Sequence, residues 1–108
     1  MISQKLIDCF HELKKNATGC ILLTQVGAFM QVMGNDVRKV SDLTGLKLKM
    51  AGDIDHLEVI GGFPKSGVDK YVGMLVRSGH SVAIADQDNQ KNREIREMIK
   101  IKRGIVDL

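Results

Sequence analysis

Hydrophobic positions recur at helical spacing near the N-terminus and then change to an extended pattern. Ser3 can cap a first helix, and apolar side chains around and after it fall on one helical face: Ile2, Leu6, Cys9, Phe10 and Leu13. Residues 16–19 end this helix. Residues 20–26 begin with side chains that are apolar on both faces, which is typical of a buried strand. Gly27 interrupts the run, and residues 28–33 are predicted to form a second short strand.

A second helix is predicted after residue 34. Asn35 can cap it, Asp36 lies in its first turn where a negative charge is favourable, and Gly45 ends it. Residues 46–50 alternate as a strand or the approach to one. Residues 51–55 form a loop, and residues 57–60 form a further strand.

The clearest helical pattern begins at Ser66, which forms a capping box with Asp69 and precedes apolar residues at helical spacing up to Gly79. Residues 81–85 are predicted to be a short buried strand.

The C-terminal region contains a charged segment with apolar residues at longer intervals. Residues 89–98 are predicted to form a charged helix with Ile95, Met98 and Ile99 on its inner side, followed by a final strand containing Ile99, Ile101, Ile105 and Val106. Helices and strands therefore alternate almost throughout. This pattern predicts an α/β fold, in which residues 1–108 form a single domain with a mixed β-sheet flanked by α-helices.

Composition supports one compact domain, since 108 residues with 44% hydrophobic and 27% charged side chains can bury a substantial core. Trp is absent, so Phe10, Phe63 and Tyr71 are expected to be its few large members. Cys9 and Cys20 lack zinc-ligand spacing and are expected to be reduced and packed as small apolar side chains. No signal peptide or apolar run of ~20 residues is found, so we expect a cytoplasmic protein without membrane contact.

Few residues point to catalysis. Gly62 and Gly67 have the separation of a phosphate loop, but Val68 and Asp69 follow where Lys and Ser or Thr are needed, so a turn into a helix is favoured. One acidic cluster could hold magnesium in a nuclease: Asp53, Asp55, His56 and Glu58. It lies in a single loop with no second cluster elsewhere, which favours a solvated loop. We therefore predict no catalytic residue, no metal site and no cofactor.

Basic residues are compatible with a polyanionic partner. The net charge is +3, and the basic residues gather in three places: Lys14 and Lys15, Lys47 and Lys49, and a C-terminal group of Lys91, Arg93, Arg96, Lys100, Lys102 and Arg103. Such charges can bind DNA by neutralising phosphates, although solvated faces carry them as well.

Three stretches, in the right order and spacing over roughly residues 4–107, resemble the N-terminal mismatch-recognition domain of the MutS family. Residues 21–37 are similar to its strand ending in Q-V-G-D-F-Y-E and the following G-E-D-A helix start. Gly62-Phe63-Pro64 and the helix bearing Tyr71 are similar to its A-G-x-P turn and tyrosine-bearing helix. Residues 79–87 closely resemble its G-x-x-V-A-I-x-x-Q strand.

The resemblance implies a mixed sheet with surrounding helices and a DNA-binding role. By position, Phe29 stands for the phenylalanine that wedges beside a mispaired base, and Gln31 stands for the glutamate that contacts the base. We predict a DNA-contacting surface that contains Phe29, Met30, Gln31, Lys47, Lys49 and Lys65. The expected partner is mismatched or distorted double-stranded DNA, and a larger repair protein is a further candidate. The ATP site of full-length family members is not expected in this chain.

The resemblance is incomplete at the wedge. Ala28, Met30 and Gln31 replace the aspartate, tyrosine and glutamate of G-D-F-Y-E, and Phe29 could instead pack in the core. The polarity of Gln31, which shares strand parity with Phe29, favours an exposed Phe29. Two other functions stay open: a protein-interaction module that has lost mismatch reading, and a metal-dependent nuclease.

Overall fold

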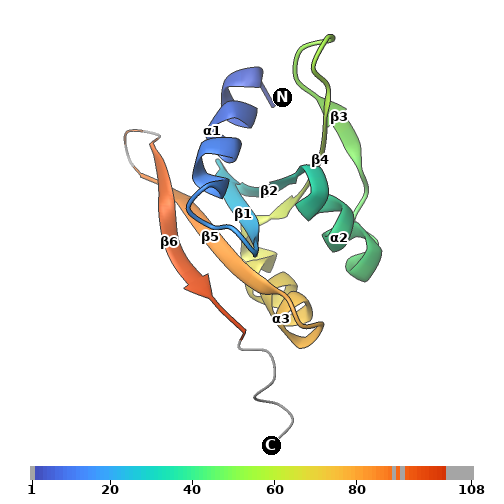
Figure 1. The fold of residues 1–108 in the computed structure, drawn as a ribbon, viewed down its shortest axis with the longest axis vertical. Coiled ribbons are helices and arrows are strands. Elements are labelled where there is room, and N and C mark those ends of the chain that lie inside the picture. Colours follow the sequence, from blue (N-terminus) through green and yellow to red (C-terminus); the bar gives the residue numbers. More distant parts are fainter. Residues whose placement is uncertain (1, 89, 91, 102–108) are drawn as a thin grey trace, which may run out of the picture.

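A six-stranded mixed β-sheet organises the chain, and α-helices cover both of its faces (Figure 1). The computed structural model describes residues 2–88, 90 and 92–101. The strand order is β3-β4-β2-β1-β5-β6; β1 and β5 are parallel and the other neighbouring pairs are antiparallel. This confirms the predicted α/β fold. In chain order the elements are α1 (Gln4–Lys14), β1 (Cys20–Val26), β2 (Phe29–Met33), α2 (Gly34–Thr44), β3 (Lys49–Ala51), β4 (Glu58–Pro64), the 3-10 helix η1 (Lys65–Gly67), α3 (Val68–Arg77), β5 (Ser81–Gln87) and β6 (Arg93–Ile99).

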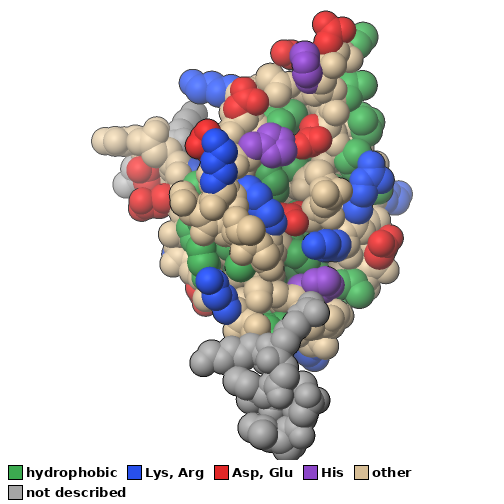
Figure 2. Space-filling view, viewed as in Figure 1, with side chains coloured by type: hydrophobic (Ala, Val, Ile, Leu, Met, Phe, Trp, Pro, Cys, Tyr) green, Lys and Arg blue, Asp and Glu red, His purple; other side chains and the backbone are tan. Residues whose placement is uncertain are grey.

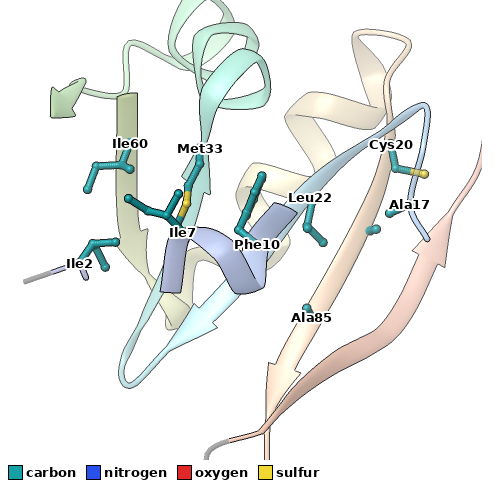
Figure 3. Packing of buried hydrophobic residues seen from close by; sticks show 10 residues of the cluster. Ile2, Ile7, Phe10, Ala17, Cys20, Leu22, Met33, Ile60 and Ala85 are labelled. Carbon is teal, nitrogen blue, oxygen red and sulfur yellow. The ribbon is translucent and has the colours of Figure 1, made fainter. Parts of the chain in front are cut away.

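The core consists of two clusters, one on each face of the sheet, because successive strand residues point to opposite sides. On one face, Ile7 and Phe10 of α1 pack against Leu22 of β1 and its neighbours (Figure 3). On the other face, α2 and α3 pack against Leu23 of β1 and further buried strand residues. Cys20 is buried in the first cluster, and both cysteines are free thiols.

A partly buried ion pair joins α1 and α2 to the middle of β1. The Lys14 ammonium lies 2.7 Å from the carboxylate of Asp36 and also donates to the Cys20 carbonyl. The same carboxylate accepts the Leu22 N–H at 3.0 Å. Lys14 is therefore committed to a structural contact, and its predicted availability for phosphates is not supported. Asp36 lies in the first helical turn as predicted, and its contacts extend beyond the helix to β1.

Two predicted helix caps are wrong, whereas the cap at Ser3 is confirmed by its bond to the Leu6 N–H. The helix α2 begins directly after β2, so Asn35 lies inside its first turn and Met33 occupies the N-cap position. Ser66 lies inside η1, because β4 extends to Pro64 and the helix α3 begins only at Val68. Neither helix has a side-chain cap.

The predicted C-terminal helix over residues 89–98 is also wrong, because residues 93–98 belong to the edge strand β6 (Arg93–Ile99), while residues 89 and 91 lie outside the described residues. Its ladder with β5 shifts by one residue at Arg96, which stands opposite no residue of β5. This bulge puts Ile95 and Met98, three residues apart, on the same face of the strand. A helix would produce the same spacing, which explains the error. Within the predicted final strand, Ile99 ends β6, and residues 102–108 lie outside the described residues.

The strands near β4 also have different boundaries from those predicted. A strand is expected over residues 46–50, but β3 is shorter and begins three residues further along the chain, at Lys49–Ala51. Leu46 instead packs against the core cluster that α2 and α3 cover. The strand expected over residues 57–60 continues through Gly61 and Gly62 to Pro64. The two glycines therefore belong to the sheet and not to a turn.

Candidate nucleic-acid interface

Phe29 stands at the exposed end of the β1–β2 hairpin. Val26 pairs with Phe29, so only Gly27 and Ala28 form the connecting loop. Gly27 has φ 62°, a conformation that such two-residue loops require and that glycine adopts easily. The Phe29 side chain is 50% exposed. It therefore presents an aromatic ring to solvent and is not a core residue.

Strand alternation separates the predicted contact residues of β2. Phe29 and Gln31 share one face of the sheet with the core residue Met33, and α1 covers that face only in part. Met30 points to the opposite face, is 1% exposed and stands beside Phe63 on β4. The prediction that Met30 contacts DNA is therefore wrong, because its side chain lies in the core.

The side chain of Gln31 on β2 lies over a glycine of the neighbouring strand β4. Gly62 pairs with it on β4, and a Cβ atom at residue 62 would stand 2.7 Å from Gln31 Nε2. The amide therefore occupies the space that any larger residue would fill. Thr24, its other neighbour across the sheet, is buried, and its hydroxyl has no hydrogen-bond partner among the described residues. Gln31 is partly exposed and presents both a donor and an acceptor at the surface.

A hollow of about 1000 Å³ brings most of the predicted residues together. Its lining includes Phe29, Gln31, Lys47 and Lys49. Lys65 does not line the hollow but lies next to the Phe29 hairpin, since its N–H donates to the Ala28 carbonyl at 2.8 Å and Pro64 pairs with Phe29. Its side chain is exposed. Tertiary structure thus brings together an aromatic residue, a glutamine and three lysines from β2, η1, β3 and the segment that leads into β3.

The lysines at this surface have no acidic counterpart in the described part of the chain. Its salt bridges involve other residues, and none includes Lys47, Lys49 or Lys65. All three side chains are exposed. Because their charge is not compensated locally, they can attract phosphates at little desolvation cost.

Comparison with known proteins identifies the family of the chain. The family model for MutS domain I matches residues 4–108. The chain belongs to the MutS domain I family. It is 31% identical over 111 residues to the DNA mismatch repair protein MutS of Porphyromonas gingivalis, covering 100% of this chain and 12% of that protein. For the MutS of Cytophaga hutchinsonii the identity is 34% over 102 residues, or 92% of this chain and 11% of the relative. The chain thus spans about a tenth of the length of these relatives.

In this MutS domain I, the acidic cluster does not form a metal site. The Glu58 carboxylate lies 2.8 Å from His11 Nε2 on α1, while Asp53, Asp55 and His56 are exposed in the β3–β4 loop. Within residues 2–88, 90 and 92–101, no group of three or more His, Cys, Asp or Glu side chains could hold a metal ion. The nuclease hypothesis therefore has no geometric support there.

Two of the C-terminal basic residues are engaged in contacts away from the hollow. Arg93 Nε donates to the Gln25 carbonyl at 2.7 Å, and Arg96 pairs with Asp86 and Glu97. Lys91, Lys102 and Arg103 fall outside the described residues. Each α-helix in the described part of the MutS domain is too short to cross a membrane.

Gln25 and Gln87 lie in two of the family motifs, and the sequence pattern predicts no contact for either of them. In the structure, the side chains of both residues form hydrogen bonds with the backbone of Gly27. The sequence does contain a signal for this contact, because a glutamine stands at or near the end of each of two buried strands, Gln25 in β1 and Gln87 in β5.

Proposed function

We propose that this domain binds double-stranded DNA and probes mismatched or distorted sites with Phe29 as a wedge. The observation that carries the proposal is the half-exposed Phe29 ring at a hairpin end, beside Gln31 and uncompensated lysines. The family membership and the names of the relatives, which are DNA mismatch repair proteins, support the same conclusion.

The wedge acts by stacking. Unstacking one base step costs a few kcal/mol, and the cost is lowest where a mispair already weakens the duplex. An aromatic side chain that stacks on a base recovers about 1–3 kcal/mol. Phe29 is partly exposed to water, so its insertion also buries apolar surface. The net balance favours insertion at a weakened step over a matched one.

Gln31 contributes contacts to a base edge near the inserted ring. Its amide can donate to a ring nitrogen or carbonyl oxygen and accept from an amino group, so it tolerates several mispairs. It is neutral, unlike the glutamate of the family motif, and therefore does not repel phosphates. Lys47, Lys49 and Lys65 supply contacts to the DNA backbone that orient the domain without reading sequence.

Phe29→Ala is expected to weaken binding to a mismatched duplex by roughly tenfold and to leave matched-duplex binding nearly unchanged. The reason is that the ring contributes only where a base step opens. Fluorescence anisotropy with matched, mismatched and bulged duplexes measures both affinities. Leu43→Ala is the control, because Leu43 is a similarly exposed apolar residue on α2 that does not line the hollow. Equal and salt-insensitive binding to all duplexes would refute the proposed function.

The double variant Lys47→Gln, Lys49→Gln is expected to weaken matched and mismatched binding equally. Each lost phosphate contact lowers the slope of log Kd against log salt by about 0.9, so the slope falls by nearly 2. A salt titration measures it. Lys39→Gln, Lys70→Gln changes the total charge equally, on helices that cover the opposite face, and should alter the slope less. Equal slopes for the two double variants would exclude the hollow as the DNA-binding surface.

A protein-interaction role is the second candidate. Exposed apolar residues gather on and around β3, including Leu48, Met50, Ile54 and Leu57. Figure 2 shows hydrophobic side chains along the edge of the molecule where Figure 1 places β3. Under this alternative, Met50→Ser with Ile54→Ser removes co-purification with a partner, and Phe29→Ala leaves it unchanged.

A further inference from the structure

Two glutamine side chains hold the backbone of the loop that precedes Phe29. Gln25 Nε2 donates to the Gly27 carbonyl at 3.1 Å, and Gln87 Oε1 accepts the Gly27 N–H at 3.1 Å. The two residues also bond to each other, because Gln25 Oε1 accepts the Gln87 N–H at 2.8 Å. We refer to Gln25 and Gln87 as the glutamine pair. Both backbone polar groups of Gly27 are thus satisfied by side chains, one of them from a strand sixty residues away in the chain.

The glutamine pair continues the sheet where its backbone ladder stops. Parallel pairing of β1 with β5 ends at Thr24 and Ala85. Beyond this point the side chain of Gln25 satisfies the N–H of Gln87, and the side chain of Gln87 reaches the hairpin loop. The contacts therefore join the loop to β5, a central strand that packs in both core clusters.

One further bond restrains the loop itself, and another holds the end of β1 that leads into it. The Ala28 carbonyl accepts the Lys65 N–H at 2.8 Å, and Arg93 Nε donates to the Gln25 carbonyl at 2.7 Å. A two-residue loop at the end of a hairpin would otherwise be among the least restrained parts of the domain. Here the loop is connected to β5 and η1, and the adjoining end of β1 is connected to β6. Neither Gln25 nor Gln87 lines the hollow beside Phe29, so their contacts serve the loop and not that surface.

We propose that Gln25 and Gln87 are positioning residues that fix the hairpin loop and thereby the direction in which Phe29 is presented to DNA. The inference rests on the proposed function. A ring that inserts between base pairs must be held firmly. If its loop is mobile in the unbound domain, the loop has to become ordered on insertion, and this loss of conformational entropy lowers the affinity. A loop already restrained in the unbound domain avoids that loss, and the restraint matters only where the ring inserts.

Gln87→Met tests the inference, because it removes the acceptor for the Gly27 N–H and keeps a side chain of similar length. Gln87→Glu is the conservative rescue, since a carboxylate oxygen can still accept that N–H. Gln90→Met is the matched control: Gln90 is exposed in the β5–β6 connection, and its side chain has no hydrogen bond among the described residues. Four readouts are needed: the unfolding midpoint, the hydrogen-exchange rate of the Gly27 amide, the ratio of matched to mismatched Kd, and the fluorescence of 2-aminopurine beside the mispair.

In Gln87→Met we expect faster exchange of the Gly27 amide, a roughly fivefold lower Kd ratio and weaker 2-aminopurine fluorescence, as for the loss of one hydrogen bond. Gln87→Glu and Gln90→Met should keep the wild-type ratio. If Gln87→Met does not fold, Gln25→Glu replaces it, because it removes only the donor to the Gly27 carbonyl. A wild-type ratio in the tested glutamine variant, with the ratio lost in Phe29→Ala, overturns the positioning role and leaves the proposed function intact. A ratio unchanged by Phe29→Ala overturns both.

Discussion

Asp36→Ala is expected to lower the free energy of unfolding by about 3 kcal/mol. Two groups lose the carboxylate at once: the Leu22 N–H, and the Lys14 ammonium, which keeps only its bond to the Cys20 carbonyl. Lys14 is 30% exposed and can turn toward water, which keeps the loss at the lower end of that for a buried ion pair. The Leu22 N–H is buried in β1 and has no such alternative, and an unpaired buried donor costs about 1–3 kcal/mol.

Urea unfolding followed by circular dichroism measures this effect as a shift in midpoint at constant slope. Asp42→Ala is the matched control, since Asp42 is exposed on the same helix. Asp36→Asn should fall between Asp36→Ala and the wild type, because an amide oxygen can still accept the Leu22 N–H. A loss below about 1 kcal/mol in Asp36→Ala would mean that the ion pair contributes no more than an ordinary surface contact.

Gly61→Ala is expected to lower the free energy of unfolding by about 2 kcal/mol, while Gly62→Ala changes it by less than about 1 kcal/mol. A Cβ at residue 61 would lie 2.8 Å from Val37 Cγ2 and 3.1 Å from the Lys47 carbonyl oxygen. Val37 is fully buried and β-branched, and the Lys47 oxygen belongs to the backbone, so neither can move easily. At residue 62 the obstacle is only the end of the Gln31 side chain.

The two glycine variants should differ in DNA binding as well. Gly62→Ala displaces the Gln31 amide and should lower the preference for mismatched over matched duplex by a few-fold. Gly61→Ala, measured well below its unfolding midpoint, should keep that preference. The same urea series gives both stabilities, and anisotropy gives the preference. Equal stability losses at the two positions would show that the close contacts at Gly61 relax as easily as those at Gly62.

Much of the fold followed from local sequence signals. The helix capped by Ser3, the apolar run of β1 and the Gly27 break in the first hairpin each depend on neighbouring residues alone. Strand parity also indicated correctly that Phe29 and Gln31 share a face. The same parity places Met30 on the opposite face, so its predicted contact with DNA did not follow from the alternation.

The C-terminal strand and the full length of β4 depended on distant partners. The bulge at Arg96 exists only because β6 pairs with β5, and in isolation the spacing of Ile95 and Met98 is that of a helix. The sequence pattern predicts a strand that ends at Ile60 and a turn from Gly62 into a helix. Contacts with α2 and Gln31 leave no space for a side chain at Gly61 and Gly62, and this is decided by packing alone.

The sequence by itself determined the fold class, the family and the presence of an aromatic residue at the end of the first hairpin, because these depend on local patterns and on motif order. Only the tertiary structure decided that Phe29 is exposed, that Lys47 and Lys49 line the same hollow, and that Gln25 and Gln87 hold its loop. The reason is physical: exposure and hydrogen bonding depend on which strands become neighbours, and the strands that meet here are far apart in the chain.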